Sequence, residues 1–120
     1  LLILFFYLGC PSCTGRAIPF ANKMVYEHGD KINVIGIHSN FEGPEYTDDD
    51  IVETLTSLYV RFPFYRDSGL ATTFHDYQAA GTPHWIFVDK SGKVIRSIFG
   101  SDPNRALLRL DYAINEELNM

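Results

Sequence analysis

The chain has 120 residues, of which 46% are hydrophobic and 21% charged, and its formal net charge is -5 at pH 7. This length fits one domain with a hydrophobic core of its own, so we take residues 1–120 as a single domain. An acidic chain without a lysine or arginine block lacks the basic face that nucleic acid and anionic membranes require, which argues against both as main partners.

Residues 1–8 (LLILFFYL) are apolar throughout, which predicts a central strand covered on both faces. The run is too short to cross a bilayer and has no basic residues before it, so we do not interpret it as a signal peptide. The chain begins inside this strand and without a methionine. We therefore expect a processed or trimmed domain, with any targeting segment or membrane anchor lying upstream.

The sequence Cys10-Pro11-Ser12-Cys13 follows this strand and contains the only two cysteines of the chain. A disulfide between residues so close together constrains little of the unfolded chain and stabilises it little. Two thiols on a turn that opens a helix can, however, close and reopen a disulfide, which is a two-electron reaction. We predict Cys10 as the nucleophile, because a helix N-terminus favours its thiolate, and Cys13 as the buried resolving thiol.

A helix is predicted from about residue 11 to residue 28, with a kink at Pro19 and an end at Gly29. The run from 31 to 38 (KINVIGIH) is rich in β-branched residues and predicts a second strand. The order strand, helix, strand implies a parallel pair with a right-handed crossover. The carboxyl ends of these strands share one edge, so residues 38–40 and the loop 41–46 are expected near the cysteines as substrate contacts.

Thr47 is predicted to begin the next helix as its N-cap, with Asp50 at the capping-box position. We interpret the acidic run 48–50 as part of this cap and not as a metal site. The apolar face of the helix is assigned to Ile51, Leu55, Leu58 and Tyr59. An extended piece at 62–65 and a short helix at 69–77 are predicted to follow.

A strand at 84–89, a turn at 90–92 and a strand at 93–99 form a predicted hairpin, and Asp102-Pro103 begins the last helix. Trp85 is assigned to core packing. The residues of the last helix expected to cover the sheet are Leu107, Leu110, Tyr112, Ala113, Ile114 and Leu118. The fold class is therefore α/β: a central mixed sheet built as βαβ, a helical insertion and ββα, with helices on both faces.

This order of elements, with a CxxC pair at a helix start, resembles the thioredoxin fold over essentially the whole chain. The long stretch before Gly81 and the sequence GTPHWIFVDKSGKVI at 81–95 are similar to the TlpA/ResA-type thiol-disulfide oxidoreductases. The resemblance implies a cis peptide bond at Pro83 facing the disulfide, with the Thr82 backbone free to pair with an extended substrate. It also implies protein disulfide or dithiol substrates, an upstream thiol electron donor or acceptor, and an extracytoplasmic location, with a cytoplasmic one left open.

The sequence departs from the thioredoxin pattern at three places. Gly9 precedes the first cysteine where thioredoxins have tryptophan, and Leu4 occupies the position of their buried acid. Residues 14–16 (TGR) contain no acid after the second cysteine, where many TlpA/ResA-like proteins have one. These positions leave no evident proton acceptor for Cys13, so the fold is better defined than the direction of electron flow.

We therefore predict a protein thiol-disulfide oxidoreductase, with a reductase favoured, without a metal or other cofactor. Cys10 and Cys13 are the catalytic residues. The residues assigned to substrate binding are Pro11, Ser12, Thr82, Pro83 and His84. As further hypotheses, the Ser12 hydroxyl and Arg16 stabilise the Cys10 thiolate. His84 either tunes that thiolate or is a half-exposed strand histidine without a role.

Other function classes remain as alternatives. A copper-handling metallochaperone would use the CxxC pair with His84, although copper-handling relatives space their cysteines as CxxxC. A zinc site needs four ligands, and one CxxC with unpaired histidines at 28, 38, 75 and 84 does not supply them. A peroxidase would need threonine where Tyr7 lies, three residues before Cys10. A redox-inactive thioredoxin-like binding domain is the last alternative, and its expected sign, loss of a cysteine, is missing.

Overall fold

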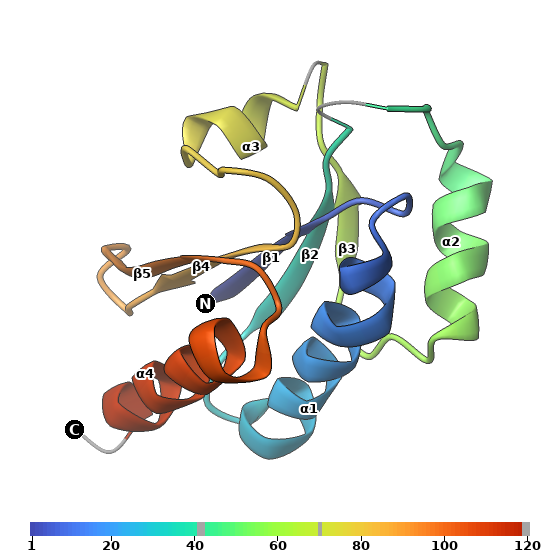
Figure 1. The fold of residues 1–120 in the computed structure, drawn as a ribbon. Helices are drawn as coiled ribbons and strands as arrows, with labels where there is room; N and C mark the ends of the chain where they lie inside the picture. The colour runs from blue at the N-terminus through green and yellow to red at the C-terminus, as the bar shows by residue number, and fades with distance from the viewer. Residues whose placement is uncertain (41–42, 70, 119–120) are drawn as a thin grey trace.

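A five-stranded mixed sheet forms the centre of the protein (Figure 1), in the strand order β3-β2-β1-β4-β5. The computed structural model describes residues 1–40, 43–69 and 71–118. Strands β1, β2 and β3 are parallel, and β4 and β5 complete the sheet as antiparallel neighbours. The sheet confirms the predicted βαβ pair and the hairpin, and its strands are β1 (Leu2–Phe6), β2 (Val34–His38), β3 (Phe64–Arg66), β4 (His84–Val88) and β5 (Val94–Phe99).

Helices cover both faces of the sheet, as predicted (Figure 1). Because side chains alternate along a strand, Leu4 and Phe6 of β1 enter the core beneath α1 and α4, whereas Ile3 and Phe5 enter the core beneath α3. Both faces of β1 are therefore buried, which explains why its sequence is apolar throughout. The helices are α1 (Ile18–His28), α2 (Asp48–Ser57), α3 (Thr72–Asp76) and α4 (Leu108–Leu118).

Near Pro19, where the sequence predicts a kink, the structure has a π-helical segment, Cys13–Ala17, directly before α1, and Pro19 is the second residue of α1. The N–H of Ile18 bonds to the carbonyl of Cys13, five residues back. Pro19 has no N–H to donate and its ring would crowd the carbonyl four residues earlier, so a widened turn suits this position. The helical stretch that carries the cysteines is thus continuous with α1.

Helix α2 begins with the predicted capping box. The Asp50 N–H donates to the Thr47 hydroxyl and the Thr47 N–H donates to the Asp50 carboxylate, both at 3.0 Å. Ile51 and Leu55 are buried as predicted. The assignment of Tyr59 to the same apolar face is wrong: the helix ends at Ser57, and Tyr59 follows in a left-handed conformation with 79% of its surface exposed.

The last helix begins at Asp102, whose carboxylate accepts the N–H groups of Asn104 and Arg105. A π-helical segment, Pro103–Leu107, leads into α4. Leu110, Ala113 and Ile114 are buried against the sheet. The assignment of Tyr112 to this face is wrong, because two residues advance a helix by about 200° and point the ring into solvent.

Several predicted boundaries shift by a few residues. The second strand begins at Val34, the extended piece is displaced to β3, and the predicted short helix is limited to α3. Trp85 is completely buried, as expected for core packing. Within the described residues, every helix is too short or too polar to cross a membrane.

Candidate active site

The cysteine pair lies where the chain leaves β1 and turns into a helix. The Cys10 N–H donates to the Tyr7 carbonyl at 3.0 Å, and the Cys13 N–H donates to the Cys10 carbonyl at 3.1 Å. This turn leaves Cys10 partly exposed and places Cys13 in the core beneath α1, with no exposed surface. The two sulfurs therefore lie in different environments although only two residues separate them.

The surroundings of Cys10 favour its thiolate. Partial burial by itself would raise the pKa of Cys10, but hydrogen bonds from Cys13 and from the Ser12 hydroxyl outweigh that effect, so the pKa lies below its usual value. Ser12 Oγ lies 3.3 Å from the Cys10 sulfur. The residues between the two cysteines thus supply a direct contact with the exposed sulfur.

Cys13 has the opposite tendency. Burial, followed by its hydrogen bond to Cys10, raises the pKa of Cys13 well above its usual value. The thiol therefore stays protonated while Cys10 carries the negative charge. An exposed thiolate beside a buried thiol is the arrangement that sequential thiol-disulfide exchange uses.

A second segment, the loop before β4, meets the cysteines. The peptide bond between Thr82 and Pro83 is cis. In its protonated form the Cys10 thiol donates to the Thr82 carbonyl oxygen at 3.4 Å, a contact between residues 72 positions apart in the chain. Pro83 is buried and its carbonyl accepts the Gly100 N–H at 2.8 Å, which anchors this loop to the end of β5.

An open groove of about 700 Å³ lies over the Cys10 sulfur. The Tyr7 hydroxyl donates to the Pro44 carbonyl and so holds one wall of the groove. Part of the loop predicted to contact substrate is therefore at the cysteine rim, whereas residues 41–42 lie outside the described residues. The lining consists of Tyr7, Gly9, Cys10, Gly43, Pro44, Ala80, Gly81, Thr82 and Phe99.

His38 and Ser39 are buried and do not face this groove as the substrate contacts we expected. His38 Nε2 accepts the Leu8 N–H at 3.2 Å, and the ring packs against Tyr7. The Ser39 hydroxyl donates to the Asp67 carboxylate at 2.9 Å. His38 thus supports the start of the turn, and the Ser39 N–H donates to the Phe6 carbonyl at 2.9 Å, because parallel pairing places the end of β2 beside the exit of β1.

The structure does not bring His84 together with the cysteines. His84 lies on the opposite face of β4 from Trp85, which shares the core of Cys13, because adjacent strand residues point to opposite faces. The ring is buried, with Nε2 at 2.8 Å from Ser97 Oγ and Nδ1 accepting the Ala80 N–H at 3.3 Å. The expectation of a half-exposed histidine is therefore wrong.

Arg16 and Ser12 differ in how they relate to Cys10. Arg16 is exposed. The N–H groups of Arg105 and Asn104 lower the pKa of Asp102 at the start of the last helix, and the Arg16 charge adds a smaller effect there. Ser12 contacts the Cys10 sulfur directly, and Pro11 is exposed beside it. Of the two side chains considered as partners for the thiolate, the structure brings only Ser12 to Cys10.

Sequence reasoning missed two aromatic walls of the groove, Tyr7 and Phe99. Phe99 is 57% exposed at the end of β5, and a Cβ added at Gly81 would lie 2.9 Å from its ring. Gly9 has the same relation to Tyr7, whose ring would lie 2.6 Å from an added Cβ. Gly81 and Phe99 belong to separate segments, so their proximity has no signal in the sequence, whereas Tyr7 and Gly9 are two residues apart and could have been considered together.

Neither cysteine belongs to a cluster of three metal-ligating side chains in the part of the chain that the structure describes. A mixed sheet whose first strand leads into a dithiol turn, facing a cis-proline loop, defines the thioredoxin-like class of proteins.

Comparison with solved structures assigns the family. A crystal structure of a thioredoxin-like superfamily protein is 30% identical to this chain, with a TM-score of 0.87, over 99% of this chain and 79% of that one. A thiol-disulfide isomerase from Corynebacterium glutamicum is 25% identical, with a TM-score of 0.87, over 99% and 80% of the two chains. The chain therefore belongs to the thioredoxin-like superfamily.

A structure described as an exposed lipoprotein thioredoxin from Streptococcus pneumoniae shares the fold at 20% identity, with a TM-score of 0.73, over 93% of this chain and 82% of that one. No protein-family model and no curated protein sequence matches the chain.

Proposed function

We propose that this protein is a protein thiol-disulfide oxidoreductase whose active site is Cys10-Pro11-Ser12-Cys13. The observation that carries the proposal is the inequality of the two sulfurs: Cys10 is partly exposed with a lowered pKa, and Cys13 is buried with a raised one. An inert pair of structural thiols has no need of this difference. The 25% sequence identity to a thiol-disulfide isomerase of the same fold supports the same class of reaction.

The reaction proceeds by two exchanges. The Cys10 thiolate attacks one sulfur of a substrate disulfide, the substrate S–S bond breaks, and the departing substrate thiolate takes up a proton. Cys13 then loses its proton and attacks the Cys10 sulfur of the mixed disulfide. The second substrate thiol departs, Cys10 and Cys13 form a disulfide, and the substrate has gained two electrons.

The groove over Cys10 is the proposed substrate site. The Ser12 hydroxyl and the Thr82 carbonyl both contact the reacting sulfur. We assign Pro11 and Pro83, their neighbours in the chain, to the same substrate site. An extended substrate segment would lie along the Thr82 backbone, because Pro83 has no N–H and cannot pair there itself. The exposed ring of Phe99 gives this groove an apolar wall.

We further propose that the protein acts as a reductase outside the cytoplasm, as one domain supplied with electrons by an upstream thiol donor. The similarity of residues 81–95 to the TlpA/ResA-type sequence supports this reading. A membrane anchor preceding the described chain would fit the same role, and the fold shared with an exposed lipoprotein agrees with it.

The equilibrium reduction potential of the Cys10–Cys13 pair tests the direction. Titration in thiol redox buffers is expected to give one two-electron transition near the thioredoxin value of about -270 mV. A value near about -120 mV, that of DsbA, would make the protein an oxidant instead. Absence of any two-electron transition would remove the oxidoreductase proposal.

Trapping tests the separate roles of the two cysteines. The Cys13→Ala variant is expected to accumulate mixed disulfides with substrate proteins, because the resolving thiol is gone. The Cys10→Ala variant is the matched control and should accumulate almost none, since Cys13 has no exposed surface. If the Cys10→Ala variant trapped as much as Cys13→Ala, the assigned order of attack would be wrong.

A further inference from the structure

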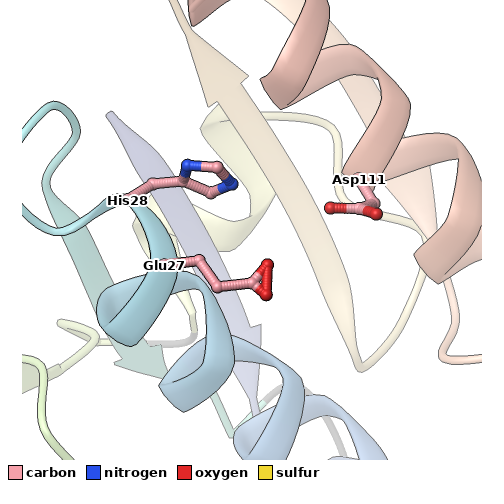
Figure 2. A group of neighbouring side chains, drawn as sticks. All are labelled: Glu27, His28 and Asp111. Atoms are coloured by element: carbon pink, nitrogen blue, oxygen red, sulfur yellow. The ribbon is translucent and has the colours of Figure 1, made fainter.

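Three metal-ligating side chains converge far from the cysteines, where the end of α1 lies beside α4 (Figure 2). Glu27 and His28 are the last two residues of α1, and Asp111 belongs to α4. One ligand atom from each lies within 4.8 Å of the other two. From Cys13 to His28 the helix rises about 22 Å, so this cluster is separate from the groove.

A second observation concerns the imidazole itself. Nε2 of His28 is buried and has no hydrogen-bond partner, and it is one of only two such side-chain atoms among the described residues. Figure 2 shows the His28 ring directed toward the two carboxylates. A buried polar atom without a partner lowers the stability of the fold, unless a bound water, ion or ligand interacts with it. A metal ion is such a group, because neutral imidazole nitrogen is a common metal ligand.

The local charge also favours a cation. Glu27 and Asp111 bring two carboxylates together, and the negative end of the α1 dipole lies at His28. The observed partners of the carboxylates compete only weakly with an ion: Lys23 Nζ is 4.0 Å from Glu27 on an exposed face, and the Asn115 amide donates to Asp111 at 3.2 Å. The Asn115 contact would orient the Asp111 carboxylate as outer partners of metal ligands do.

The spacing is close to what an ion requires. A point equidistant from three atoms 4.8 Å apart lies roughly 2.8 Å from each (4.8 Å divided by √3), and zinc binds nitrogen and oxygen at about 2.0–2.2 Å. Small side-chain rotations that move each ligand atom by less than about 1 Å would therefore bring all three within bonding distance of the ion. From this geometry we infer that Glu27, His28 and Asp111 form a binding site for a divalent first-row transition metal such as Zn²⁺, with water completing the coordination.

The ligand set distinguishes this ion from magnesium and calcium. One nitrogen and two carboxylates suit Zn²⁺, whereas Mg²⁺ and Ca²⁺ prefer oxygen ligands and six or more of them. Binding would join the end of α1 to α4, which are distant in sequence, and so stabilise their packing on the same face of the sheet. The inference does not depend on the proposed redox function.

Isothermal titration with Zn²⁺ tests the site, in tag-free protein carrying Cys10→Ser and Cys13→Ser so that no thiol can bind the ion. We expect one Zn²⁺ per chain, no comparable binding of Mg²⁺, and a higher unfolding temperature with Zn²⁺. His28→Gln and Asp111→Asn should each weaken Zn²⁺ binding at least about tenfold. Absence of saturable Zn²⁺ binding would overturn the inference.

His75→Gln and Glu116→Gln are the matched controls. His75 lies in the last turn of α3 and Glu116 on α4, both are exposed, and neither belongs to the cluster. Their Zn²⁺ affinity should be unchanged. Equal affinity in His28→Gln and in the controls would place the bound ion elsewhere and reject this site.

A measurement on the histidine nitrogens needs no substitution in the cluster. In a long-range NMR spectrum of the imidazole groups, Zn²⁺ is expected to shift the His28 signals and leave those of His75 and the buried His38 and His84 in place. A spectrum in which His28 does not respond to Zn²⁺ would reject the site even if the variants fail to fold.

Discussion

At the scale of single residues, one turn of helix makes Cys10 and Cys13 chemically unequal. The turn exposes the first sulfur to the groove and buries the second beneath α1. The Ser12 hydroxyl lies on the exposed side and is the side chain between the cysteines that contacts Cys10. Ser12 should therefore contribute to the acidity of Cys10 without touching the core.

Replacing Ser12 with alanine is expected to raise the pKa of Cys10 by about half a unit to one unit. One hydrogen bond contributes about 0.5–1.5 kcal/mol, and one pKa unit corresponds to 1.36 kcal/mol. The pH dependence of iodoacetamide alkylation at Cys10, followed by mass spectrometry, measures the shift. Thr14→Ala is the control, since the Thr14 hydroxyl donates to the Pro11 carbonyl. An unshifted midpoint in Ser12→Ala would remove Ser12 from this role.

His38 supports the same turn from beneath. Its Nε2 can accept the Leu8 N–H only while the imidazole is neutral. Burial, with a smaller effect of the Arg66 charge, lowers the pKa of His38 from 6.5 to about 4. The unfolded chain therefore binds a proton on His38 at a higher pH than the folded protein does. The contribution of His38 to the free energy of unfolding is fully present above pH 6.5 and is lost as the pH falls toward 4.

Substitution of His38 by phenylalanine keeps a ring but removes the acceptor. We expect a loss of about 1–3 kcal/mol at pH 7, because the Leu8 N–H is left without its partner. The decline in stability between pH 6.5 and 4 should also become shallower, with His84, whose pKa burial lowers too, accounting for part of what remains. Urea unfolding at several pH values measures both effects, and a slope in the variant as steep as in the wild type would remove His38 from this role.

At the scale of elements, the sequence pattern at Thr47 forms the cap it predicts because every contact is local. The reciprocal bonds between Thr47 and Asp50 satisfy backbone groups at the start of α2. Replacing Thr47 with alanine should lower the free energy of unfolding by about 1 kcal/mol. Thr56→Ala is a matched control on the exposed face of the same helix and should cost little or be slightly stabilising. Denaturant unfolding distinguishes them, and equal effects would argue against the cap.

At the scale of the whole molecule, stability depends on how α1 and α4 pack on one face of the sheet. Leu110 is completely buried there, whereas Leu108 on the same helix is 44% exposed. Leu110→Ala is expected to cost about 2–5 kcal/mol through lost burial and a residual cavity, and Leu108→Ala about 0.5 kcal/mol or less. Unfolding followed by the fluorescence of the buried Trp85 measures both. Similar losses in the two variants would contradict the packing described here.

Local patterns in the sequence were sufficient for the elements and for the reacting pair. The apolar run of β1, the capping residues of α2 and the spacing of Cys10 and Cys13 all act over a few residues, so each could be interpreted without knowing the fold. Tyr59 and Tyr112 were wrongly assigned to buried faces. Hydrophobic periodicity alone does not show where a helix ends or which aromatic side chains are exposed to solvent.

The sequence by itself determined the class of fold and the dithiol, because hydrophobic period, caps and CxxC spacing are short-range properties. Only the tertiary structure decided which distant residues meet them. It brought the Thr82 carbonyl to Cys10, turned His84 to the other face of the sheet, buried His38 beneath the turn, and gathered Glu27, His28 and Asp111 between two helices. The physical reason is that the alternation of side chains along strands and the packing of helices bring together residues far apart in the chain. The residues next to each of them in the sequence do not indicate which distant partner it will contact.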